Sequence, residues 1–125
     1  MAKKFGDLIY TQEEAPEQAI SKAETHTPKI EAPDTVKAGE PFTVKVAVGP
    51  HEMKAHHSIR YVELWFAEEG RPFNPVKIAT IVWEPEYTVA EASVTVTLKK
   101  SGVLYAISYC NLHGLWEARK EIKVE

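Results

Sequence analysis

The chain has very little cysteine, since Cys110 is the only one among its 125 residues. A lone cysteine cannot form an intramolecular disulfide, so the fold does not depend on a disulfide framework. Proteins without disulfides are typical of reducing compartments, and we therefore expect a cytoplasmic location.

Long apolar runs are also missing, and the longest ones are far too short to cross a bilayer. The lysines near the N-terminus are not followed by an apolar stretch of signal-peptide length. The net charge of −3 shows no basic excess of the kind that binds nucleic acids or anionic membranes. We expect neither kind of partner, and the length predicts one core-forming domain.

Seven segments have the length and composition of β-strands. Phe42, Val44, Val46 and Val48, for example, alternate with polar or small residues and so share one face of a strand. Turn residues such as glycine, proline and serine separate the segments, which are 29–32, 42–48, 59–66, 76–83, 87–98, 103–109 and 115–124. This spacing predicts an all-β fold, an immunoglobulin-like seven-stranded antiparallel β-sandwich, over residues 26–125.

Residues 1–25 form a different kind of segment, rich in Glu, Gln, Ala and Lys and without strand-like alternation. We expect an N-terminal extension that is irregular or contains one short helix at 17–23, with Pro16 in its first turn. So short a helix needs to dock on other parts of a protein to persist.

The cysteine and several histidines are grouped in a way that predicts a metal site. Cys110 and His113 lie three residues apart in the turn between the last two strands, and His51 and His57 lie in the loop before the strand at 59–66. His26 precedes the first strand of the sandwich. Loops at one end of a sandwich can meet around one ion, and sulfur with imidazoles suits iron, copper or zinc rather than calcium or magnesium.

The residues around these positions form a more specific pattern. The segments are YCNLHGLW at 109–116, PHEMKAHHSI at 50–59 and ETHTP at 24–28. In these segments the chain resembles the superoxide reductases, which comprise the neelaredoxins and the catalytic domain of the desulfoferrodoxins. The resemblance covers about residues 24–124. Since no second cysteine is present, the chain resembles the one-iron type.

The resemblance implies one non-haem iron per chain, held by four equatorial histidines and an axial cysteinate. On this sequence these ligands are His26, His51, His57, His113 and Cys110. His56 is one residue short of the ligand spacing, so we expect it to be a neighbour of the site.

The implied reaction is the one-electron reduction of superoxide to hydrogen peroxide at Fe(II), followed by re-reduction by an external donor. The family suggests rubredoxin as this donor and a homotetramer as the assembly. Glu24 matches a glutamate that can occupy the sixth iron position in the ferric state. The family usually has a lysine next, whose charge attracts superoxide, but this chain has Thr25. Lys22 and Lys54 are candidates to replace that charge, and we favour Lys22.

Three other functions remain open from the residues alone. A cupredoxin-like electron-transfer protein also has a cysteine and a histidine on a late loop, although neither Met1 nor Met53 follows His113 as a copper ligand would. A superoxide dismutase would use a similar metal but would both oxidise and reduce superoxide. A binding module of the same fold would leave the histidine and cysteine spacing without a role.

Overall fold

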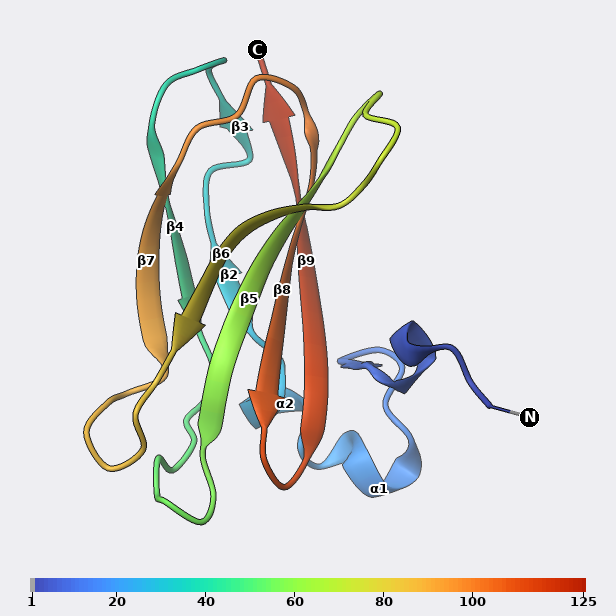
Figure 1. The fold of residues 1–125 in the computed structure, drawn as a ribbon, viewed down its shortest axis with the longest axis vertical. Helices are drawn as coiled ribbons and strands as arrows, with labels where there is room; N and C mark the ends of the chain where they lie inside the picture. Colours follow the sequence, from blue (N-terminus) through green and yellow to red (C-terminus); the bar gives the residue numbers. More distant parts are fainter. Residues whose placement is uncertain (1) are drawn as a thin grey trace.

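Two facing β-sheets form most of the molecule in the computed structural model, which describes residues 2–125 (Figure 1). The larger sheet has the order β1-β9-β8-β5-β6, with β3 also paired to β9, and the smaller has the order β2-β4-β7. The strands are β1 Tyr10–Thr11, β2 Lys29–Glu31, β3 Thr35–Val36, β4 Phe42–Ala47, β5 Ile59–Glu68, β6 Val76–Val82, β7 Glu91–Val96, β8 Gly102–Cys110 and β9 Gly114–Val124.

The predicted sandwich is confirmed, and its seven predicted strands correspond to β2 and β4 to β9. The described residues contain two further strands, β1 and β3, of two residues each. Both pair in parallel with β9, whereas the other strand pairs are antiparallel. Two residues are too few to show the alternation from which a strand is predicted.

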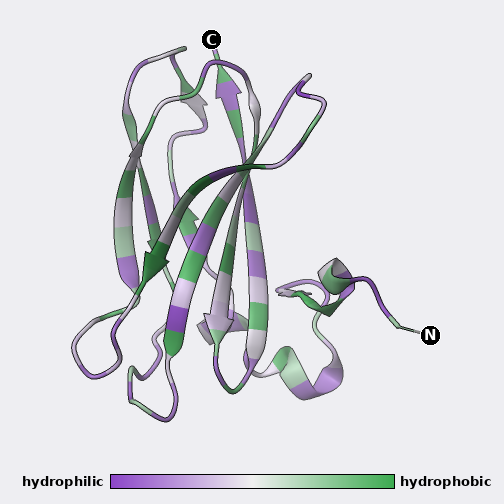
Figure 2. Cartoon of the chain, in the orientation of Figure 1, coloured by the Kyte–Doolittle hydropathy of each residue, from purple (hydrophilic) through white to green (hydrophobic). Residues whose placement is uncertain are grey.

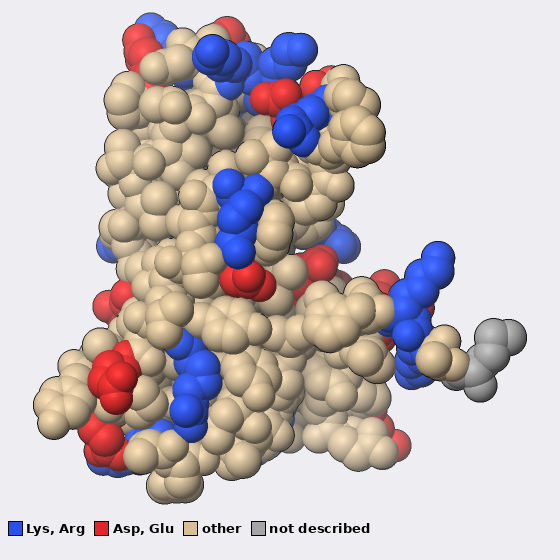
Figure 3. Space-filling view, in the orientation of Figure 1, with Lys and Arg blue, Asp and Glu red and all other residues tan. Residues whose placement is uncertain are grey.

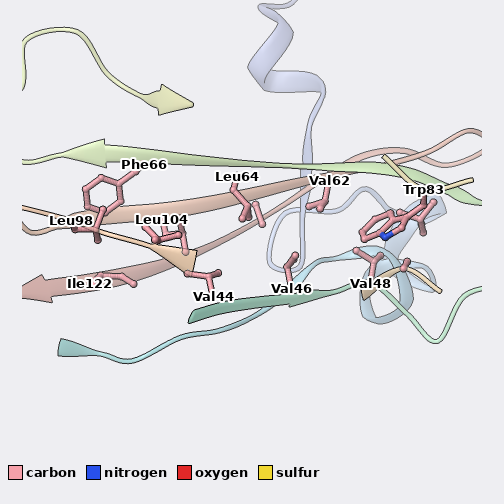
Figure 4. Packing of buried hydrophobic residues seen from close by; sticks show 14 of the residues in the cluster. Val44, Val46, Val48, Val62, Leu64, Phe66, Trp83, Leu98, Leu104 and Ile122 are labelled. Atoms are coloured by element: carbon pink, nitrogen blue, oxygen red, sulfur yellow. The ribbon is translucent and has the colours of Figure 1, made fainter. Parts of the chain in front are cut away.

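The core lies between the two sheets and follows from the alternation of apolar and polar residues along each strand (Figure 2). Val44 and Val46 of β4 point toward Val62 and Leu64 of β5 (Figure 4), and all four are at most 1% exposed. Burying a valine or leucine side chain contributes about 1.5–3 kcal/mol. The facing strands therefore supply the stability that holds the connecting loops in place.

The loop between β4 and β5, the turn between β8 and β9, and the short helix α2 lie at the same end of the sandwich (Figure 1). The β8–β9 turn has three residues between the paired Cys110 and Gly114. Gly114 has a φ of 81°, a left-handed conformation that favours glycine, as is common at the end of three-residue hairpin loops. This turn places the cysteine at the last position of β8.

The N-terminal segment contains a 3₁₀-helix, Phe5–Leu8, and two four-residue helices, α1 Glu17–Ile20 and α2 Ala23–His26. The single helix predicted at 17–23 is thus divided in two, with a turn at Ser21 and Lys22. Helices this short are marginal by themselves, and α2 is held by burial of Ala23 and His26. Among the described residues, no helix is long and apolar enough to cross a membrane.

Candidate metal centre

Four histidines and the cysteine meet at this end of the sandwich. One donor atom from each of His26, His51, His57, Cys110 and His113 lies within 4.8 Å of all the others. The predicted grouping of these five residues is therefore present in the structure, and the cluster could hold a metal ion.

Each element brings its residue to the cluster for a local reason. His26 ends α2, and its carbonyl accepts a hydrogen bond of 2.9 Å from the buried hydroxyl of Ser108 on β8. The carbonyl of His113 accepts a hydrogen bond of 3.0 Å from the indole Nε1 of Trp116, which is fully buried. These bonds fix both histidines to the larger sheet.

A tight turn in the β4–β5 loop decides which of the two adjacent histidines joins the cluster. Backbone hydrogen bonds join Lys54 and His57 in both directions, at 3.0 and 3.1 Å. The side chain of His57 is 18% exposed as a result, whereas that of His56 is 79% exposed. His56 is therefore a neighbour of the cluster and not a member of it.

The imidazole rings present defined nitrogens to the centre. Nε2 of His26 lies 3.1 Å from Nε2 of His51 and 3.2 Å from Nδ1 of His113. Sγ of Cys110 lies 3.6 Å from Nδ1 of His113 and 3.7 Å from Nε2 of His51. These contacts join four of the five residues around one small volume.

In three of the rings, a hydrogen bond at the nitrogen that faces away from the centre determines the tautomer. Nδ1 of His26 donates to the carbonyl of Lys22 at 3.0 Å, and Nδ1 of His51 donates to the carbonyl of Glu52 at 2.6 Å. Nδ1 of His57 donates to Oε1 of Glu52 at 2.8 Å. Carbonyl and carboxylate oxygens only accept, so in each neutral ring the proton is on Nδ1 and the lone pair is on Nε2.

The protonation of the rings suits metal binding. Burial, together with the neighbouring His51, lowers the pKa of His26 from its ordinary value of 6.5 to about 4. Burial also lowers the pKa of His51 and that of His113, where the charge of Lys22 adds to the effect. Neutral imidazoles with free lone pairs are the form that binds metals.

Two further observations test whether these residues fit an iron or a similar ion. Nε2 of His57 is buried and has no hydrogen-bond partner within residues 2–125, which is a costly state for a polar atom. Cys110 is a free cysteine with 0% exposure, and its sulfur lies beside the imidazoles. A transition metal that binds both imidazole and thiolate would satisfy both groups, and iron is such a metal, so the donor set fits iron.

The residues predicted to assist the site lie near it to different degrees. Glu24 is exposed on α2, two residues before His26, and Thr25 donates its hydroxyl to the carbonyl of Lys22 at 3.2 Å. Lys22 is half-buried and lowers the pKa of both His51 and His113 through its charge. Its positive charge therefore acts on the cluster.

Lys54 occupies a different environment. Its Nζ lies 3.8 Å from Oε1 of Glu86, and its side chain is 59% exposed. Lys54 is not among the groups that lower the pKa values of His26, His51 and His113. Of the two candidate lysines, Lys22 is therefore the one whose charge contributes to the lowered pKa values of His51 and His113.

The sequence did not indicate two polar residues that hold the loops together. Asn111 accepts a hydrogen bond from the Ser58 amide at 2.9 Å and donates one to the His56 carbonyl at 2.9 Å. Glu52 bonds two imidazoles of the cluster. Asn111 is part of the Cys-x-x-His segment and could have been suspected, whereas no spacing rule singles out Glu52.

Known proteins of similar sequence match most of the chain. The model of the desulfoferrodoxin family matches residues 18–119. A superoxide reductase from Pyrococcus furiosus is 39% identical over 77% of this chain and 86% of that protein. A neelaredoxin from Megalodesulfovibrio gigas is 32% identical over 83% of this chain and 91% of that protein.

A solved structure of a superoxide reductase is also similar to this chain. A superoxide reductase (neelaredoxin) from Ignicoccus hospitalis has a TM-score of 0.93 and 67% identity, and the match covers 98% of this chain and 100% of that one. The similarity therefore covers both the sequence and the fold over almost the full length of the two chains.

Proposed function

Since the chain belongs to the superoxide reductase family and is an oxidoreductase that acts on superoxide, we propose that it reduces superoxide by one electron to hydrogen peroxide. We propose one iron per chain, with His26, His51, His57, His113 and Cys110 as its ligands. The observation that carries this proposal is the approach of five donor atoms to within 4.8 Å of one another. The reaction consumes one superoxide, one electron and two protons for each peroxide.

The protein's own residues are in the chemical state that metal binding requires. Iron, when bound, would supply the electron that superoxide takes up. The imidazoles of His26, His51 and His113 stay neutral because their pKa values are lowered, so they do not need to lose protons before they bind a metal at neutral pH. The sulfur of Cys110 is shielded from solvent, which protects the thiol from oxidation.

We propose two accessory residues in α2 and the turn before it. Glu24 would supply a carboxylate to the site when no substrate is bound, as its position two residues before His26 in the family pattern suggests. Lys22 would attract superoxide and substitute for the charge that Thr25 lacks. The action of its charge on His51 and His113 supports this role.

The electron must come from another protein or reductant, and we propose rubredoxin. The cycle would then remove superoxide at the expense of cellular reductant, which is a detoxification reaction coupled to electron transport. We also propose a cytoplasmic location, which fits a lone, unpaired cysteine that has to stay reduced.

The assembly that we propose is a homotetramer of chains in which residues 26–125 form the sandwich and residues 1–25 an extension. The outer face of β5 and β8 supports it, since Tyr61 and Tyr109 stack there and Trp65 is paired with Tyr105. Figure 3 shows large uncharged areas on this side of the molecule. In the extension, Phe5 is 68% exposed in a single copy. A second copy could cover these aromatic side chains.

Metal analysis and the visible spectrum test the proposed centre. Iron near one per chain, with a thiolate-to-Fe(III) absorption band that is lost in Cys110→Ser, would support it. Copper in place of iron would favour the electron carrier, which needs only two of the four histidines. An iron protein whose spectrum is unchanged in Cys110→Ser would contradict the proposed ligand set.

A further inference from the structure

Glu52 contacts two of the four imidazoles at once, and it is the residue directly after His51. Its backbone carbonyl accepts the Nδ1 proton of His51 at 2.6 Å. Its carboxylate oxygen Oε1 accepts the Nδ1 proton of His57 at 2.8 Å. One residue therefore fixes the tautomer of both rings that the β4–β5 loop brings to the cluster.

The contact with His57 differs in charge from the other outer contacts of the cluster. Nδ1 of His26 and Nδ1 of His51 bond neutral backbone carbonyls. Within residues 2–125, His57 alone has a carboxylate on the ring nitrogen that faces away from the centre. The same carboxylate oxygen lies 3.8 Å from Nε2 of the exposed His56, which is too far for a hydrogen bond.

A carboxylate on an imidazole has two separable effects. As an acceptor, it holds the proton on Nδ1 and so aims the lone pair of Nε2 at the centre, where this atom is buried without a partner. As an anion, it makes Nε2 of the ring a stronger electron-pair donor to a metal, and it places negative charge beside any metal bound there. An uncharged acceptor of the same shape would keep the first effect and lose the second.

We infer that Glu52 is a positioning residue that orients His57 toward the metal and lowers the reduction potential of the centre through its charge. This inference rests on the metal centre described under the proposed function, and it adds a residue outside the ligand set. A lower potential favours donation of an electron to superoxide, so Glu52 would set part of the driving force.

The test compares Glu52→Gln and Glu52→Ala with the unchanged chain in two measurements. Titration of the metal-free protein with Co(II), followed by its absorption, gives the metal affinity. We expect Glu52→Ala to weaken cobalt binding by about 10- to 100-fold, and Glu52→Gln, which retains the acceptor, to weaken it much less. A redox titration of the iron-loaded proteins should give a higher midpoint potential for both variants.

Glu86 offers a matched control, because it is a carboxylate bonded to the same loop without touching a histidine of the cluster. Its Oε2 accepts the amide proton of Ala55 at 2.8 Å, and its Oε1 lies near Lys54. Glu86→Gln and Glu86→Ala should leave cobalt affinity and potential unchanged. Equal shifts in the Glu86 variants would overturn the inference by showing that loop stability alone is responsible.

The failure of this inference can be distinguished from failure of the proposed function. If the unchanged chain binds cobalt with a thiolate charge-transfer band, but both Glu52 variants match it in affinity and potential, Glu52 has no positioning role. If the unchanged chain itself binds no cobalt, the proposed metal centre and the inference both fail.

Discussion

Lys22 is the residue that we propose compensates for the positive charge that Thr25 lacks. The family usually has a lysine at the position of Thr25. In this chain the charge of Lys22 contributes to the lowered pKa values of His51 and His113. Charge near a site accelerates the encounter with a small anion, and salt screens this effect.

We predict that Lys22→Ala slows the bimolecular reaction with superoxide by about 10-fold at low ionic strength and weakens its dependence on salt. Pulse radiolysis measures both quantities. Lys54→Ala is the control and should leave the rate unchanged, because Lys54 is paired with Glu86. A Lys22→Ala variant with an unaltered rate and salt dependence would show that no substitute lysine is needed.

The lowered pKa of His26 predicts how the stability of the metal-free protein depends on pH. Its pKa is about 4 in the folded chain and about 6.5 when unfolded, so between these values the unfolded state binds more protons. The contribution of the neutral His26 ring to the free energy of unfolding is therefore fully present above pH 6.5 and is lost as the pH falls to about 4.

The metal-free protein should therefore unfold at lower denaturant concentrations at pH 4.5 than at pH 7. Denaturant titrations at the two values measure the difference in the free energy of unfolding. The His26→Gln variant, which cannot gain this proton, should show a smaller difference. An identical difference in the variant would assign the pH dependence to other groups.

At the scale of the elements, the site depends on how the β8–β9 turn is attached to the β4–β5 loop. Asn111 makes this attachment through its side chain, with hydrogen bonds to the residues on either side of His57. Removing it leaves a backbone amide and a carbonyl without their partners, which costs about 1–3 kcal/mol for a buried group.

We predict that Asn111→Ala lowers the free energy of unfolding by about 1–2 kcal/mol and also weakens metal binding. Asn74 is a matched control at the β5–β6 loop, where its side chain accepts the Glu68 amide at 3.0 Å and donates to the Glu68 carbonyl at 2.9 Å. Asn74→Ala should lower stability without a change in metal affinity. Thermal unfolding and metal titration of both variants check this difference, and equal metal affinities in the two would contradict it.

The elements also show what a sequence can and cannot reveal. Val44 and Val46 alternate with polar residues, and such alternation was sufficient to predict β4 and the other long strands. The two-residue strands β1 and β3 were not predictable, because their pairing with β9 depends on tertiary contacts. The roles of Glu52 and Asn111 depend on side-chain directions in loops, which no periodicity encodes.

For the molecule as a whole, convergence of three distant segments was predictable in outline. A sandwich brings alternate loops to one end, so His57 and Cys110 were expected to meet there. Which nitrogen of each ring faces the centre followed only from the hydrogen bonds of the folded chain. The order of the strands and the division of α1 from α2 likewise emerged only in the structure.

The proposed homotetramer is a prediction at this scale. Ile107 is half-buried on the outer face of β8, opposite Glu63 of β5. We expect Ile107→Glu to reduce the oligomer to a smaller species, because a charge would be buried in the interface beside a like charge. Analytical ultracentrifugation measures the mass, and an unchanged mass in the variant would place the interface elsewhere.

The central claim is that this chain reduces superoxide and does not dismutate it. The most direct measurement adds a known amount of superoxide to an excess of the reduced, iron-loaded protein and determines hydrogen peroxide and oxygen together. We predict one peroxide for each superoxide and no release of oxygen. One oxygen and one peroxide for every two superoxide ions would contradict the claim and identify a dismutase.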